Sequence, residues 1–160
     1  MGAAAGLLLA AALGIQLRLL CNLLDGMVAI EGGMKSKTGE IWNDLPDRIA
    51  DSLIFVGAGY SLYGLRWGPA LGWLAAVLAI FTAYVRLLGG AAGVTQHFIG
   101  PMAKPQRMAA MTIACLLAAA ERLAGWPPRA LALALGIVIA GSVVTAVRRT
   151  RRIARELAAK

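Results

Sequence analysis

Residues 3–29 read AAAGLLLAAALGIQLRLLCNLLDGMVA, an apolar run that contains few polar side chains. A helix that crosses the hydrocarbon core of a bilayer needs about 20 such residues, so this run is long enough to span a membrane. Four further apolar runs follow, at residues 47–63, 69–88, 107–125 and 130–147. Glycine and proline mark the breaks between the runs. The sequence therefore predicts an all-α protein, a multi-pass transmembrane helical bundle of about five membrane helices.

The composition supports a membrane environment. The 160 residues are 59% hydrophobic and 15% charged, with a mean hydropathy of +0.71, whereas soluble domains are closer to half apolar. The net charge of +8 would suit a nucleic-acid partner, but the basic residues flank apolar runs and only 6% of the residues are aromatic. We therefore expect membrane lipids, and no nucleic acid, around this chain.

Lysine and arginine are distributed unevenly between the connections. One side of the predicted bundle carries Lys35, Lys37, Arg48, Arg86, Lys104, Arg107 and the tail at 148–160. The other side carries Arg66, Arg122 and Arg129. Because positively charged connections stay in the cytoplasm, we expect the first side to face the cytoplasm, in a cell inner membrane. Residues 1–147 then form a transmembrane domain, and 148–160 form a basic cytoplasmic tail on the inner membrane surface.

This orientation places Met1 outside the cell, which is unusual for an uncharged start. The first run is also too polar on one face for a signal peptide. We hypothesise that a helix preceding Met1 in the native protein is absent from this chain.

The first predicted helix carries polar side chains on one face. Arg18, Asn22 and Asp25 are spaced i, i+4, i+7, which places them on the same side of a helix. Gly26 and Ala29 follow near that face, where small residues let another helix or a flat ligand approach the backbone. Polar residues inside membrane helices are costly and usually functional, so this face is a candidate site.

The second predicted helix begins with a matching stripe. Asn43, Asp47 and Asp51 are spaced i, i+4, i+8, and Asp44 lies beside Asp47. A short connection makes the two helices antiparallel neighbours, so we expect their stripes to meet just inside the cytoplasmic surface. Converging carboxylates repel each other unless a cation separates them, and carboxylate and amide oxygens suit Mg²⁺ or Mn²⁺. The stripes therefore predict a divalent-ion site.

A simpler interpretation of the same residues is also open. Asn43 and Asp44 can cap the start of a helix, while Asp47 can pair with Arg18 or Arg48. Neither interaction accounts for the remaining polar residues of the first helix.

Arg86, Lys104 and Arg107 form a second group on the predicted cytoplasmic side. Arg86 ends the third predicted helix, and Arg107 begins the fourth. Cations at one membrane level can bind a phosphate group. The alternative is that they only flank membrane spans, as the positive-inside rule requires.

The stretch 22–51, NLLDGMVAIEGGMKSKTGEIWNDLPDRIAD, resembles the signature of the CDP-alcohol phosphatidyltransferase family, which reads D-x2-D-G-x2-A-R-x8-G-x3-D-x3-D. The positions that match without a gap are Asp25, Gly26, Ala29, Gly39 and Asp47. The positions that depart are Asn22, Ile30 and Asn43, which stand where the signature has its first aspartate, its arginine and its third aspartate.

The resemblance implies an integral membrane enzyme of phospholipid biosynthesis. The family usually has six membrane helices, which agrees with an absent first helix here. Its reaction transfers a phosphatidyl (substituted phosphate) group from CDP-diacylglycerol, or a similar CDP-alcohol, to an alcohol acceptor and releases CMP. Family members hold divalent ions with the motif aspartates, so the resemblance implies Mg²⁺ or Mn²⁺, as two ions.

The family roles can be carried over to individual residues. The implied metal ligands are Asn22, Asp25, Asn43, Asp44 and Asp47. Asp47 would be the catalytic base, and Asp51 would join it in the last two positions if the motif is shifted by one helical turn. The implied nucleotide-binding residues are Gly26, Ala29 and Gly39. An acidic acceptor such as a polyol phosphate would contact Arg86, Lys104 and Arg107.

Two other functions are open. One is a family-like but catalytically silent membrane protein that binds lipid or a partner helix. The other is a small transporter or channel subunit in which Arg18, Asn22 and Asp25 line a polar path. Metal-dependent CMP release, lost in Asp25→Ala or Asp47→Ala, identifies the enzyme, and substrate flux without nucleotide binding identifies the transporter. A homodimer is compatible with each of these functions.

Overall fold

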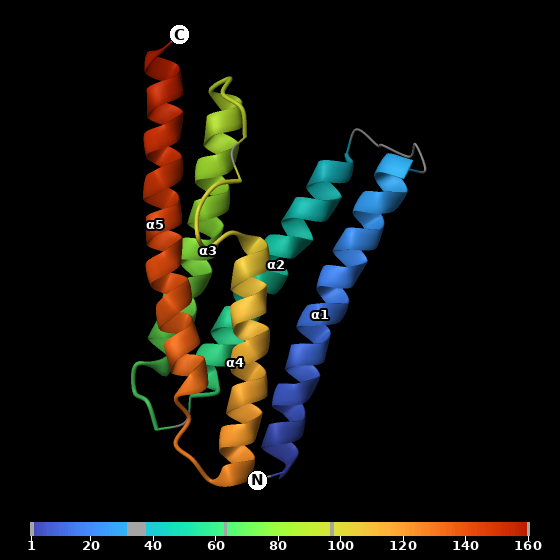
Figure 1. The fold of residues 1–160 in the computed structure, drawn as a ribbon, viewed down its shortest axis with the longest axis vertical. Helices are drawn as coiled ribbons and strands as arrows, with labels where there is room; N and C mark the ends of the chain where they lie inside the picture. The colour runs from blue at the N-terminus through green and yellow to red at the C-terminus, as the bar shows by residue number, and fades with distance from the viewer. Residues whose placement is uncertain (1, 32–37, 63, 97, 160) are drawn as a thin grey trace.

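The computed structural model describes residues 2–31, 38–62, 64–96 and 98–159, with the side chains of Ala29, Ile30 and Glu40 left aside. The described chain is an all-helical bundle, which confirms the predicted fold class (Figure 1). Its helices are α1 (Gly2–Glu31), α2 (Gly39–Tyr60), α3 (Gly68–Ala91), α4 (Lys104–Ala124) and α5 (Ala130–Ala158). No β-strand occurs in these ranges.

Three of the five helices are long and apolar enough to cross a membrane, namely α1, α3 and α5. The other two have charged residues within or at both ends of their apolar segments, whereas the charged residues of α5 follow its apolar segment. Helix α2 holds Asp44, Asp47, Arg48 and Asp51, and α4 is charged at both ends. The five predicted helices are therefore all present.

Neighbouring helices in the bundle are not always consecutive in the chain. Helix α1 packs on α4, α2 packs on α3, and α5 packs on both α3 and α4 (Figure 1). The apolar side chains at the centre of the bundle are Phe55, Met108, Met111, Leu135 and Val138. Large apolar side chains also cover the outside of the helices, for example Leu7 and Leu133, and such a surface suits a lipid environment.

The closest helix contact joins α2 and α3 through glycine. A Cβ atom placed on Gly72 would lie 2.6 Å from the carbonyl oxygen of Phe55, and one on Gly59 would lie 2.8 Å from Cα of Gly72. Glycine lets two helix backbones approach this closely, which is a common way of packing helices in membranes. The contact fixes α2 against α3 and thereby sets the position of the acidic residues of α2.

Helix α2 begins earlier than the sequence predicts. We expected the second apolar run at residues 47–63, with Asp44 and Pro46 at its start and Asn43 opening the helix. The helix already starts at Gly39, and Pro46 lies inside it. A proline removes one backbone hydrogen bond, and its cost falls when tertiary packing holds the helix on both sides. The earlier start places Asn43 and Asp44 on the helix itself rather than at a cap.

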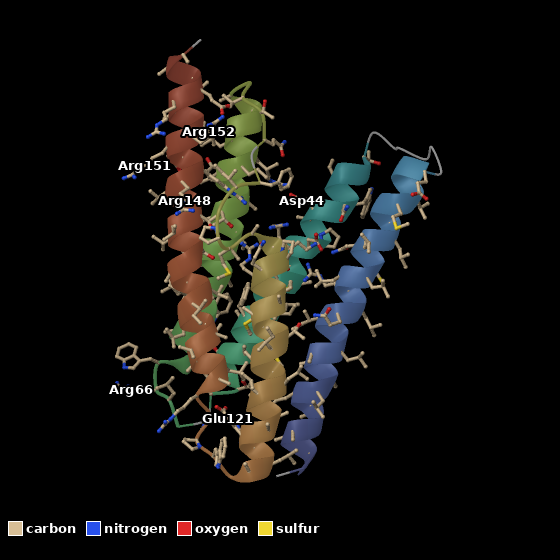
Figure 2. The ribbon with its side chains drawn as sticks, in the orientation of Figure 1. Asp44, Arg66, Glu121, Arg148, Arg151 and Arg152 are labelled. Carbon is tan, nitrogen blue, oxygen red and sulfur yellow. The ribbon has the colours of Figure 1, made fainter. Side chains whose placement is uncertain are left out.

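Helix α5 ends later than the apolar run that predicts it. We expected residues 148–160 to form a separate tail on the membrane surface, whereas α5 continues without a break to Ala158. Ile153 packs on α3, because a Cβ atom on Gly89 would lie 2.7 Å from its Cδ1 atom. Figure 2 shows Arg148, Arg151 and Arg152 along the half of α5 that leads to the C-terminus, and Arg66 near the opposite end of the bundle, as the uneven distribution of basic residues predicts.

Candidate functional site

Asp47 is the centre of a polar cluster that joins three helices. Its side chain is buried, and its Oδ1 atom lies 2.7 Å from Nη2 of Arg18 on α1. Asn22, one turn further along α1, donates a hydrogen bond from Nδ2 to the same oxygen at 2.9 Å. Lys104, the first residue of α4, contacts the second oxygen, Oδ2, through its ammonium group. The expected meeting of the two polar stripes is therefore present, with cations rather than carboxylates around Asp47.

Asp51 lies one turn further into α2 and is almost fully buried, with 1% of its surface exposed. Its Oδ1 atom is 2.7 Å from Nη1 of Arg18, and its Oδ2 atom is 3.4 Å from Nη2 of Arg107 on α4. The Arg18 guanidinium thus bridges Asp47 and Asp51. Ion pairs therefore join α1 to α2 here, although α1 packs mainly on α4.

Asp44 holds a separate pair of arginines at the rim of the cluster. Its Oδ2 atom is 2.9 Å from Nη2 of Arg86 on α3, and its Oδ1 atom is 3.4 Å from Nη2 of Arg48. The guanidinium of Arg86 also lies over the ring of Phe98, 4.8 Å from the ring centre. Such a cation–π contact, together with the carboxylate, holds Arg86 in one orientation.

Arg107 and Arg149 are charged side chains in the interior. Arg107 is 2% exposed and donates from Nη1 to Thr82 Oγ1 at 3.0 Å and to the carbonyl of Met102 at 3.2 Å. Arg149 is 5% exposed and donates to two carbonyl oxygens, those of Ile99 at 2.9 Å and Thr82 at 2.8 Å. Among the described residues no carboxylate lies within ion-pair distance of Arg149, so its charge is balanced only by neutral oxygens.

These side chains surround one cavity of about 750 Å³ between the helices, which we call the polar cavity. The residues of its wall that the sequence singles out are Asn22, Asn43, Asp44, Asp47, Arg86, Lys104 and Arg107. The wall residues that the sequence analysis did not assign to the site include Arg48, Thr82, Gln96, Phe98 and Arg149. Five cationic side chains and two carboxylates line the cavity, which leaves three positive charges in excess.

Arg149 could have been found from helical periodicity. The buried face of α5 includes Val138, Ser142, Thr145 and Arg149, at spacings of four, three and four residues. Those spacings continue one helix face past the end of the apolar run. Arg149 was not assigned to the site because it was counted among the residues of the basic tail, 148–160.

A second hollow, of about 580 Å³, lies between α1, α2 and α4, and we call it the apolar groove. Leucine, alanine and isoleucine dominate its wall, with Leu8, Ile15, Leu53 and Ile54 among them. Arg18 also lines this groove, and the same side chain binds Asp47 in the wall of the polar cavity. The two hollows therefore adjoin at the Arg18–Asp47 ion pair.

Several predicted residues lie outside the cluster. Asp25 is exposed on α1, and an added Cβ on Gly26 meets no atom within 4 Å in the described part of the chain. Gly39 is the first residue of α2 and lines neither hollow. The side chain of Ala29 lies outside the described residues. Asp51 belongs to the cluster but lies beneath the cavity rather than in its wall.

The acidic side chains, as they are placed, do not fit a pair of divalent ions. Nowhere in the described ranges do three histidine, cysteine, aspartate or glutamate residues converge on one point. Both oxygens of Asp47 bind cationic side chains, and so do both oxygens of Asp51. A divalent ion at Asp47 would have to displace Lys104 or Arg18, so the magnesium or manganese site stays a prediction.

Comparisons of the chain with protein-family models, with curated proteins and with solved structures give no match.

Proposed function

We propose that this chain transfers a substituted phosphate group from CDP-diacylglycerol, or a similar CDP-alcohol, to an alcohol acceptor and releases CMP. The observation that carries the proposal is the junction of the two hollows. A cationic cavity suits the phosphates of such a lipid, and the adjoining apolar groove suits its hydrocarbon chains. The resemblance of residues 22–51 to the family signature supports the same reaction.

The excess charge of the polar cavity supports phosphate binding. Arg86, Lys104 and Arg107, which the sequence assigned to an acidic acceptor, line one wall together with Arg48 and Arg149. Arginine offers paired N–H donors that match phosphate oxygens, and lysine offers a flexible point charge. A phosphate ligand would compensate the charge that Asp44 and Asp47 leave uncompensated.

In the proposed reaction an oxygen of the acceptor hydroxyl attacks the phosphorus atom that carries the lipid. A P–O bond to the acceptor forms, the P–O bond to CMP breaks, and CMP leaves with the electron pair of that bond. Asp47 accepts the hydroxyl proton as general base, which requires Lys104 to move from Asp47 to a ligand phosphate. Asp51 is a positioning residue, because it holds Arg18 and Arg107 in place.

Assay of the purified protein in detergent or nanodiscs tests the proposal. We expect CMP release from labelled CDP-diacylglycerol with at least one alcohol acceptor. Asp47→Asn should lower turnover by about 10²- to 10⁴-fold, since it removes the base. Arg151→Ala, an exposed position on α5, is the matched control and should leave turnover unchanged. Equal turnover of Asp47→Asn and wild type would refute the role of Asp47.

The polar cavity is further proposed to face the cytoplasm, in a cell inner membrane. Support comes from the positive-inside rule, since Arg48, Arg86, Lys104 and Arg148 lie toward the same end of the helices. Single cysteines placed at Ala154 and Arg66, in a background that carries Cys21→Ser and Cys115→Ser, report the orientation through a membrane-impermeant thiol reagent. The cysteine at 66 should react in intact cells and the one at 154 only after permeabilisation. The reverse pattern would show the opposite orientation.

A catalytically silent, lipid-binding protein is the second candidate function. The pairing of Asp47 with Arg18 and Lys104 favours it, because a base held by two cations has little tendency to accept a proton. This candidate predicts that the protein binds CDP-diacylglycerol and releases no CMP with any acceptor. The turnover assay therefore separates the two functions.

A further inference from the structure

The carboxylate of Asp47 has no free oxygen for a metal ion. Arg18 and Asn22 share Oδ1, and Lys104 holds Oδ2. The contact with Asn22 is informative because a carboxylate can only accept hydrogen bonds, so the amide of Asn22 must present its N–H group there. A metal ligand at this position would instead have to present an oxygen lone pair.

The charge balance around Asp47 also opposes a divalent ion. Asp47 and Asp51 face three cations, Arg18, Lys104 and Arg107, so the pair of carboxylates is already more than neutralised. The three cationic side chains would repel a doubly charged ion that entered this cluster, because they are close to it and screening by water is weak there. The asparagines at 22 and 43 add oxygen atoms but no negative charge.

A further observation indicates an anion as the missing partner. Nε of Arg107 is buried and has no hydrogen-bond partner in the described part of the chain. Arg149, in the wall of the same cavity, contacts carbonyl oxygens alone. Arg107 keeps an ion pair with Asp51, whereas Arg149 is a buried cation without a carboxylate partner among the described residues. Such a cation is costly, and a bound anion removes that cost.

We infer that Arg18 and Lys104 take the place of a divalent ion at Asp47, so that this chain binds a phosphate-bearing ligand without metal. Arg18 is the fixed member, because it bridges Asp47 and Asp51. Lys104 is the exchangeable member, because it lies at the first residue of α4 on a flexible side chain and lines the cavity. The inference rests on the proposed function only for the identity of the ligand as a phosphate ester or anhydride.

Inorganic pyrophosphate is the probe for the ligand part of the inference. Its affinity for the wild-type protein, measured by calorimetry, should be at least as high in EDTA as in magnesium, because free Mg²⁺ itself binds pyrophosphate and competes with the cavity. Lys104→Met should weaken binding about tenfold in EDTA, whereas Lys104→Arg should retain it. Both variants must elute as wild type in size exclusion, which separates lost binding from lost folding. Binding that requires magnesium, or no binding in either solution, would overturn the inference.

Electron paramagnetic resonance of Mn²⁺ directly tests the inference that Asp47 holds no metal ion. Free Mn²⁺ titrated into wild-type protein and into Asp47→Asn should give the same spectra at millimolar concentration, because Asp47 holds no ion. A tight Mn²⁺ site in the wild type that Asp47→Asn abolishes would overturn the inference.

The assays distinguish failure of the inference from failure of the proposed function. CMP release in EDTA supports both. CMP release that depends on magnesium supports the function and overturns the inference. Pyrophosphate binding in EDTA without any CMP release supports the inference and overturns the function.

Discussion

Arg18 connects the two buried carboxylates of the site, those of Asp47 and Asp51. Arg18 donates to Asp47 and pairs with Asp51, and its side chain also lines the apolar groove. Buried ion pairs add little net stability, yet removing one partner leaves the other charge buried and uncompensated. Arg18 therefore holds the buried carboxylates of Asp47 and Asp51 in position, and each of them loses one of its two cationic partners without it.

We predict that Arg18→Met lowers the free energy of unfolding by about 3–5 kcal/mol, since two buried carboxylates lose their shared partner. The double variant Arg18→Met, Asp51→Asn should be no more stable than the single variant, because it also removes the carboxylate that pairs with the buried Arg107. Arg151→Met, on the exposed face of α5, should change stability by less than about 0.5 kcal/mol. Denaturant unfolding in detergent measures all three, and an Arg18→Met variant as stable as the control would contradict the prediction.

Sequence reasoning found most of the residues in this cluster but not their pairing. Spacing along a helix placed Arg18 and Asn22 on one face and Asp47 and Asp51 on another, and the structure brings these faces together. The simpler interpretation, that Asp47 pairs with Arg18, is confirmed. Lys104 could not be placed against Asp47 in advance, because that contact depends on where α4 begins relative to α2 in three dimensions.

At the scale of helices, the position of α2 depends on its glycine contact with α3. The backbones are close enough at Gly59 and Gly72 that a side chain at either position would strike the other helix. Displacing α2 would shift Asp47 relative to both Arg18 and Lys104. The packing of two helices thus determines whether the polar cavity keeps its shape.

We predict that Gly72→Ala lowers the free energy of unfolding by about 1–3 kcal/mol, because its methyl group would overlap the carbonyl oxygen of Phe55. Gly136→Ala on α5 is the matched control, since an added Cβ there has open space around it. It should stabilise the helix by about 0.5–1 kcal/mol through reduced chain entropy. Equal effects of the two substitutions on the unfolding curve would show that the α2–α3 contact is not tight.

The ends of the helices were harder to predict than their centres. Apolar runs identified all five helices, but α2 starts at Gly39, before both the apolar run at 47–63 and the polar stripe that begins at Asn43. Likewise α5 continues to Ala158 through residues that are polar enough to suggest a separate tail. In both places tertiary contacts extend a helix past the apolar segment, and composition alone contains no information about such contacts.

At the scale of the whole molecule, the order of packing creates the groove. Because α1 packs on α4 while α2 packs on α3, the first two helices leave an apolar hollow between them instead of closing on each other. The sequence could not locate this groove, since a short connection suggested direct packing of α1 on α2. The groove meets the polar cavity at Arg18, and this junction is the basis of the proposed function.

We predict that Gly57→Phe blocks the apolar groove and weakens binding of CDP-diacylglycerol about tenfold or more, because Gly57 lines the groove and has free space beside it. Pyrophosphate binding should not change, since Gly57 is not part of the polar cavity. Gly136→Phe, on the exposed face of α5, is the control of equal size. Calorimetry in nanodiscs measures both ligands, and unchanged lipid affinity in Gly57→Phe would exclude the groove as the chain-binding site.

The most direct test of the account is an experimental structure of the protein saturated with CDP-diacylglycerol. The account predicts phosphate density beside Arg86, Lys104 and Arg107, and acyl-chain density between α1 and α2. Lipid bound elsewhere on the bundle, with neither hollow filled, would contradict it.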